Sequence, residues 1–108
     1  MTDLEALIAA RELLTEQSRW CRGAFARSVG GVHVHPMSPQ AVCWCAIGAL
    51  IKVTRMEPGH NAKLFLSTVA IENFHTNATV VNDHNGWGDV LRLYDLAIER
   101  MKQNEQST

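Results

Sequence analysis

The feature that most restricts the fold of this chain is the apolar run AVCWCAIGALI over residues 41–51. The run is too short to span a bilayer as a helix, so we expect it inside a globular domain. It predicts a central helix, because apolar residues cover most of its circumference. Cys45, Gly48 and Ala49 share one side of this helix, where their small side chains would let a neighbouring backbone approach. A glycine inside a helix costs about 1 kcal/mol relative to alanine, so we expect such a contact to compensate for Gly48.

The cysteines of this run do not suggest a metal or redox site. On a helix, residues two apart point about 200° away from each other, so Cys43 and Cys45 cannot bind one metal ion. The common zinc spacings place at least two residues between paired cysteines. Three cysteines in a chain whose N-terminus lacks a signal-peptide pattern predict free thiols and a cytoplasmic location.

The remaining patterns predict a mainly α, compact single domain over residues 1–108, with about four helices. A chain of 108 residues with 46% hydrophobic residues can bury a core without disulfides or metals. Thr2 and Glu5 form a capping-box pattern at the start of the first helix, and Ser38-Pro39 would start the second. We expect helices that run to about residue 18, from 38 to about 58, over 60–73 and over 86–103, an extended segment at 79–81, and a frayed tail at 102–108.

A small hairpin interrupts the helical pattern near residues 24–35. The stretches AFARS and VHVH both alternate apolar and polar residues, and Gly30-Gly31 separates them. Two alternating stretches around a Gly-Gly pair are typical of a two-stranded hairpin. A loop over the same residues remains the alternative.

The first polar candidate for a functional site is Asn82-Asp83. Asn and Asp side chains that precede a helix commonly accept hydrogen bonds from backbone N–H groups and so stabilise a turn. In the structural interpretation, Asn82-Asp83 has this role. The functional alternative places Asn82 and the Asp83 carboxylate at the mouth of a pocket lined by Trp20, Trp44 or Trp87. An Asp83 buried without a backbone partner would favour that alternative.

A second candidate is a metal site on the hairpin. His33 and His35 would lie on the same face of a strand, and Asp83 and His84 would add ligands if the turn folded beside them. The alternative is that these histidines are exposed polar residues of a loop. No HExxH or CxxC pattern supports a metal, so we expect no cofactor.

The charge balance does not favour a nucleic-acid partner. Ten basic and eleven acidic side chains leave a formal net charge of −1, and only Arg19, Arg22 and Arg27 form a local basic cluster. Two of these arginines flank Cys21, and nearby cations lower the pKa of a thiol.

Three motifs resemble an uncharacterised family of small bacterial and phage proteins. The family pattern reads W-x-x-G-A-x-A, then C-x-x-G-A-L, then N-D before a helix of the type V-L-x-x-x-D-x-A-I. The resemblance covers residues 4–100 and implies that these positions are family features, but it implies no activity. After Asn82-Asp83 the chain has Gly86-Trp87-Gly88 where the family pattern has Arg-Thr. The matching residues are Trp20, Gly23, Ala24 and Ala26, then Cys45, Gly48, Ala49 and Leu50, then Asn82, Asp83, Val90, Leu91, Asp95, Ala97 and Ile98.

The sequence is compatible with three classes of function. The first is a small non-enzymatic module that binds another protein or pairs with itself, such as an inhibitor of a host factor if the chain is phage-borne. The second is a small metal-dependent or ligand-binding enzyme that uses His33, His35, Asp83 and His84. The third, a nucleic-acid-binding regulator, would need a basic face and salt-sensitive binding.

Overall fold

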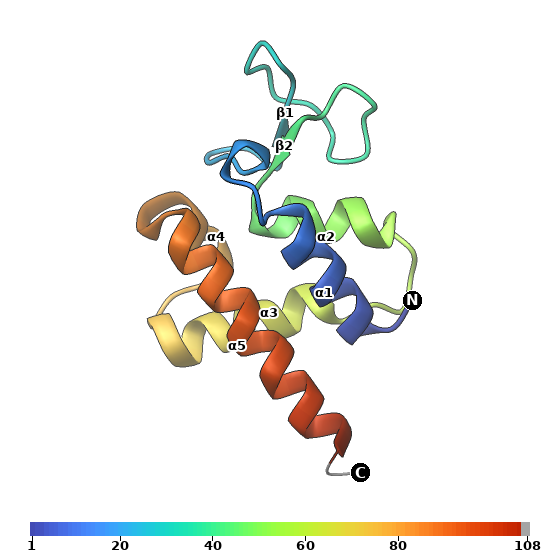
Figure 1. Cartoon of the computed structure of the whole chain (residues 1–108), viewed down its shortest axis with the longest axis vertical. Coiled ribbons are helices and arrows are strands. Elements are labelled where there is room, and N and C mark those ends of the chain that lie inside the picture. The colour runs from blue at the N-terminus through green and yellow to red at the C-terminus, as the bar shows by residue number, and fades with distance from the viewer. Residues whose placement is uncertain (107–108) are drawn as a thin grey trace.

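The computed structural model describes residues 1–106 and confirms a mainly α, compact fold. The longer helices pack together in the middle of the molecule, and a small excursion that carries the strands projects from one end (Figure 1). Within the described residues the α-helices are α1 (Asp3–Leu13), α2 (Ala46–Thr54), α3 (Ala62–Phe74), the short α4 (Ala78–Val80) and α5 (Trp87–Gln106). The other elements are a 3-10 turn η1 (Gln17–Arg19), the strands β1 (Ala26–Arg27) and β2 (Cys43–Trp44), and a π-helical turn η2 (Val81–Asn85).

Helix α1 begins at the predicted cap. The Thr2 hydroxyl accepts from Glu5 N, and the Glu5 carboxylate accepts from Thr2 N, which completes the capping box. The helix ends at Leu13 rather than near residue 18. At this end the indole of Trp87 donates to the Leu14 carbonyl at 2.9 Å, and the chain then turns into η1.

The prediction that α2 starts at Ser38 is wrong. Ser38 and its neighbours form a turn instead, in which Ala41 N donates to the Ser38 carbonyl and Gln40 N donates to the Ser38 hydroxyl. These two hydrogen bonds use the same residue types that a helix N-terminus would use. The N-cap of the helix is Cys45, seven residues after the predicted one.

The excursion spans residues 20–45 and contains the sheet. β1 pairs antiparallel with β2, with Ala26 opposite Trp44 and Arg27 opposite Cys43. The turn predicted near residues 24–35 is present, because Ser28 N donates to the Val32 carbonyl and Arg27 forms an isolated bridge with His33. The strand that pairs with β1 is nevertheless β2, whereas the stretch around His33 meets β1 only through the isolated bridge and a bond from Val34 N to the Ala26 carbonyl at 3.1 Å.

The segment 79–81 is helical, so the prediction of an extended segment there is wrong. Asn77 caps α4 by accepting from Val80 N at 2.9 Å. Val81 then begins the wider turn η2, which carries Asn82 into the interior. β-branched side chains favour strands only weakly, and here the cap and the buried amide determine the backbone.

The core lies where α1, α2, α3 and α5 meet. Helices α3 and α5 lie close to their predicted positions, and α5 stays helical to Gln106, whereas residues 107–108 of the predicted frayed tail lie outside the described residues. Within residues 1–106, none of the helices combines the length and apolar character that crossing a bilayer requires. The largest fully buried hydrophobic side chains are Leu7, Leu14, Leu66, Val69, Val81, Val90, Leu93 and Tyr94.

Candidate functional site

Asn82 is the polar centre of the molecule. Its side-chain Oδ1 accepts from the Trp20 indole at 2.7 Å and from Ala46 N at 2.9 Å. Its Nδ2 donates to the Cys21 carbonyl and to Asp83 Oδ1, both at 3.0 Å. The side chain is almost fully buried, and both of its polar atoms are hydrogen-bonded within the chain. One amide therefore joins the base of the excursion, the start of α2 and the turn η2.

Asp83 has the backbone partner that the structural interpretation requires. Its Oδ1 accepts from Gly23 N at 3.0 Å as well as from Asn82, and the residue is only half-buried. The Asn82-Asp83 pair thus joins two segments that are far apart in the sequence, since it fixes residues 20–23 against residues 82–83.

A pocket of about 310 Å³ opens beside this pair, between the excursion and the start of α4. Its volume is at the lower limit for small-ligand sites. Phe25 and Ala24 form the apolar part of the pocket wall. His33 and Asp83 contribute an imidazole and a carboxylate to the lining of the same pocket. The remaining lining residues are Gly23, Cys45, Thr79 and Asn82.

The three tryptophans do not line this pocket. The Trp20 indole donates to Asn82, the Trp44 indole donates to the Pro36 carbonyl at 2.8 Å, and the Trp87 indole donates to the Leu14 carbonyl. The Trp20 ring thus fastens the base of the excursion to η2, the Trp44 ring holds a loop within the excursion, and the Trp87 ring joins the start of α5 to the end of α1. Of the five residues predicted to surround a pocket, Asn82 and Asp83 line this one.

Cys45 lines the pocket and caps α2. Its Sγ accepts from Gly48 N at 3.2 Å, in the place that a serine or aspartate oxygen usually takes. Burial raises the pKa of the Cys45 thiol, and this outweighs the hydrogen bonds from helix N–H groups that lower it. The thiol therefore stays protonated at neutral pH and acts as a cap rather than as a nucleophile.

The small residues of α2 meet the excursion at its base. A Cβ added at Gly48 would lie 1.9 Å from the Phe25 carbonyl oxygen, so only glycine fits there. The same oxygen accepts from Cys45 N at 3.1 Å, and Ala49 is fully buried beside it in the core. Cys45, Gly48 and Ala49 thus lie together at the contact between α2 and the rest of the chain.

The residues predicted as a metal site are not assembled in this structure. In the part of the chain that the structure describes, no three His, Cys, Asp or Glu side chains are grouped so that they could hold a metal ion. His33 and Asp83 share the pocket, but His35 Nδ1 accepts from Met37 N at 3.1 Å and His84 is exposed on η2. The strand that would have aligned both imidazoles is absent beyond His33.

Cys21 differs from its expected chemistry. Burial, together with a hydrogen bond to the Cys43 thiol, raises the pKa of Cys21 to about 12, and only Arg27 opposes this change. The sequence neighbours Arg19 and Arg22 do not lower it, because Arg19 pairs with Glu16 and Arg22 stacks on the Trp20 ring.

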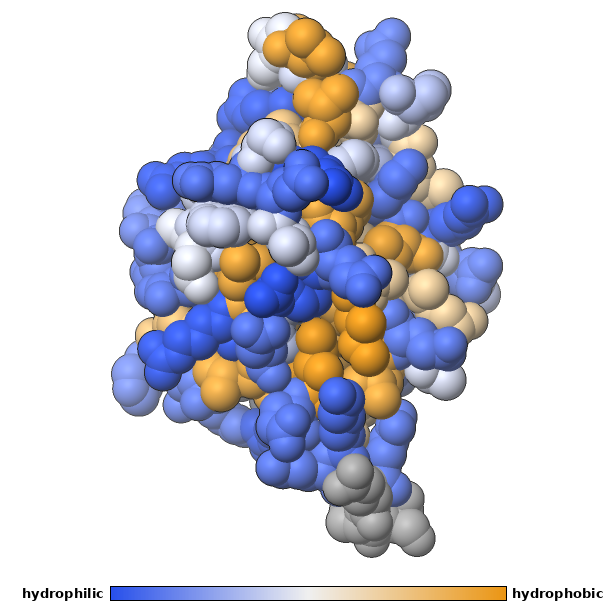
Figure 2. Space-filling view, in the orientation of Figure 1, coloured by the Kyte–Doolittle hydropathy of each residue, from blue (hydrophilic) through white to orange (hydrophobic). Residues whose placement is uncertain are grey.

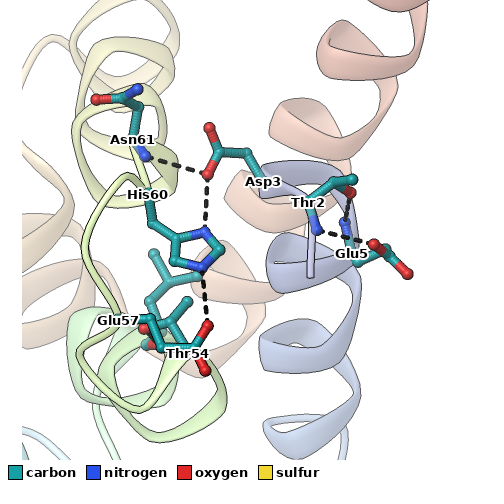
Figure 3. Close-up of polar contacts among 8 residues, drawn as sticks. Thr2, Asp3, Glu5, Thr54, Glu57, His60 and Asn61 are labelled. Atoms are coloured by element: carbon teal, nitrogen blue, oxygen red, sulfur yellow. Dashed lines mark hydrogen bonds and ion pairs between the residues drawn. The ribbon is translucent and has the colours of Figure 1, made fainter.

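A polar cluster that the sequence reasoning missed joins the starts of α1 and α3 (Figure 3). Asp3 Oδ1 lies 3.2 Å from His60 Nδ1 and accepts from Asn61 N at 3.1 Å. On the other side of the ring, His60 Nε2 lies 3.8 Å from a Glu57 carboxylate oxygen. Asp3 therefore binds the loop before α3 while it occupies the first turn of α1. No local pattern signals this contact, because the two segments are 57 residues apart.

Comparison with known proteins identifies the family. A model of a family of unknown function, DUF6197, matches residues 1–100, so the chain belongs to that family. Searches of curated proteins and of solved structures gave no match.

Proposed function

We propose that this chain is a small protein-interaction module that binds a protein partner through the end of its excursion. The surface that supports this is formed by Val29, Val32 and Val42, which we call the valine tip. Val29 is 89% exposed and Val32 is 63% exposed. Figure 2 shows hydrophobic side chains gathered at this end of the molecule.

The observation that carries the proposal is that the loops bearing the valine tip contain no charged side chain of their own. Residues 28–51 contain no Asp, Glu, Lys or Arg, although the chain as a whole has 19% charged residues. A projecting segment usually carries charges that keep it solvated, and apolar surface that departs from this pattern marks an interaction site. The tip thus has the composition of an interface centre.

The loops that bear the valine tip are held in place. Arg27 donates to the carbonyls of Gly31 at 2.9 Å and Arg22 at 3.0 Å, and the Trp44 indole holds the Pro36 carbonyl. A hollow of about 380 Å³ separates the two loops, and Val29, Pro39 and Val42 are among its lining residues. A preorganised apolar tip loses little conformational entropy on binding, which favours a specific partner.

The partner class that fits is a cytoplasmic protein with an apolar, uncharged surface. A nucleic acid is not supported, because Arg19 and Arg22 are engaged within the chain and Arg27 donates to backbone carbonyls. A metal-dependent enzyme has only the shared pocket of His33 and Asp83 in its favour.

Site-specific photo-crosslinking in cells tests the proposal. A photoreactive residue at Val29 or Val32 should give discrete adducts with another protein, whereas the same residue at the exposed Glu99 of α5 should not. A Val32→Glu substitution should remove the Val29 adducts, because it places a charge in the apolar interface. Equal adduct patterns from Val29 and Glu99, or none from either tip position, would refute the role of the tip.

A further inference from the structure

The pocket beside Asn82-Asp83 presents hydrogen-bonding groups that the fold does not use. Both hydrogen bonds that Asp83 accepts end on its Oδ1, from Gly23 N and from Asn82 Nδ2, each at 3.0 Å. Within residues 1–106 its Oδ2 therefore has no partner, and the His33 imidazole and the Thr79 hydroxyl have none either. The pocket thus offers a carboxylate oxygen, an imidazole nitrogen and a hydroxyl oxygen, each of which can accept a hydrogen bond from a bound molecule.

The charge of the pocket comes from Asp83. Among the residues that the structure describes, no Lys or Arg side chain lines the pocket. The arginines of the adjacent segment are engaged elsewhere, because Arg27 donates to the carbonyls of Arg22 and Gly31, and Arg22 stacks on the Trp20 ring. A carboxylate with an unused oxygen favours a positively charged ligand, since a charge-assisted hydrogen bond is about twice as strong as a neutral one.

The apolar part of the wall favours an organic cation. Ala24 and Phe25 form this part, and Phe25 is 53% exposed. An exposed aromatic ring attracts an ammonium group placed over its face, and it can also cover the methylene groups of a bound chain. A metal ion would need more ligands, and no three His, Cys, Asp or Glu side chains are suitably grouped in residues 1–106.

The pocket adjoins a second hollow along Phe25. This hollow has a volume of about 320 Å³, shares Phe25 and Thr79 with the pocket, and has Ile47 as a further apolar lining residue. Among the described residues, Lys63 is its only charged lining residue. The second hollow therefore suits an uncharged apolar chain and disfavours a second ammonium group.

We infer that this pocket binds a small organic monoammonium ion, R–NH3+, whose apolar chain lies along Phe25. An ammonium group has three N–H donors, and Asp83, His33 and Thr79 supply three acceptors without other partners. The site lies at the base of the excursion and does not include the valine tip. It goes beyond the proposed function, and either proposal can fail without the other.

A matched set of hexyl probes tests the charge and the chain of the ligand. In an amide NMR titration of the full chain at neutral pH, hexylamine should shift the signals of Gly23, Phe25 and Thr79 and leave that of Glu99 in α5 unchanged. Hexanol and hexanoate have the same chain without an ammonium group and should bind at least about tenfold more weakly. Hexanediamine should also bind more weakly than hexylamine, because its second ammonium group would enter the hollow beside Lys63.

Three results of this titration would overturn the inference. The first is no shift at Gly23, Phe25 and Thr79 with hexylamine at about 10 mM. The second is binding of hexanol, hexanoate or hexanediamine as tightly as hexylamine. The third is a set of shifts spread over the whole chain, Glu99 included.

Asp83→Asn and its control test the carboxylate. The amide keeps an oxygen for Gly23 N but presents an N–H group where the free carboxylate oxygen lies, so hexylamine should bind about tenfold more weakly or worse. Asp95→Asn removes the same charge from α5, where Asp95 pairs with Arg11 and does not line the pocket, and should leave the affinity unchanged. Native affinity in a folded Asp83→Asn chain overturns the inference.

Thr79→Val keeps the test decisive if Asp83→Asn does not fold. Thr79 is exposed on α4, and valine has the same shape without the hydroxyl, so the bond between Asp83 and Gly23 is not disturbed. Hexylamine should bind about threefold more weakly or worse to this variant, and native affinity would contradict the assigned acceptor set. Circular dichroism of each variant establishes that the substituted chains are folded.

Discussion

At the scale of single residues, Asn82 shows why an amide cannot be replaced by an isosteric group. It presents an acceptor to the Trp20 indole and Ala46 N, and a donor to the Cys21 carbonyl and the Asp83 carboxylate. A carboxylate would supply the acceptor but not the donor, and an aliphatic side chain would supply neither. The Asn82-Asp83 pair thus has a structural explanation in this chain.

Asn82→Asp should destabilise the fold by about 3–5 kcal/mol, because it buries a negative charge opposite the Cys21 carbonyl and the Asp83 carboxylate. Urea unfolding followed by circular dichroism measures this difference. Asn85→Asp is the matched control, since Asn85 lies in the same turn but is exposed, and its cost should stay below about 0.5 kcal/mol. Similar costs for both variants would contradict the assigned role of Asn82.

At the scale of elements, the sequence predicted helices well where caps and periodicity agree. The capping box of α1 is present, and α3 and α5 lie within a few residues of their expected bounds. The start of α2 differs from the predicted one because Ser38-Pro39 carries the same residues as a helix cap but forms a turn. The prediction of an extended segment at 79–81 is wrong because its β-branched residues do not indicate the distant contacts that bury Asn82.

The close contact of α2 with the excursion predicts how substitutions at Gly48 change the stability of the chain. Gly48→Ala should destabilise the chain by about 1–3 kcal/mol, because the added Cβ would meet the backbone of Phe25. The backbone cannot easily retreat, since the Phe25 carbonyl accepts from Cys45 N. Gly88→Ala is the control: it lies in α5 with open space around it, so alanine should stabilise by up to about 1 kcal/mol. A neutral or stabilising Gly48→Ala would refute the close approach.

At the scale of the whole molecule, the candidate site could be predicted only in part from the sequence. Asn82-Asp83 was recognisable as an Asx pair before a helix, but its partners Trp20 and Gly23 are about sixty residues away. The same holds for Asp3 and His60. The local pattern reports which groups need partners, whereas the packing of helices decides which partners they obtain.

The buried thiols and phenol predict how the whole fold responds to alkali. Burial raises the pKa of Cys21 to about 12 from an ordinary value of 9.0, and burial also raises the pKa of Cys45 and Tyr94. The folded state therefore holds these protons more tightly than the unfolded chain does. Their contribution to stability is complete below pH 9 and is lost as the pH rises from 9 towards 12.

Cys21→Ser isolates one of these groups, because serine does not titrate in this range. We expect the free energy of unfolding of Cys21→Ser to fall less steeply above pH 9 than that of the native chain. Urea titrations at a series of pH values give both slopes, and the lysines, which titrate in the same range, cancel between the two chains. Identical slopes would show that the Cys21 proton is held no more tightly in the fold than in the unfolded chain, and would place this thiol in contact with solvent.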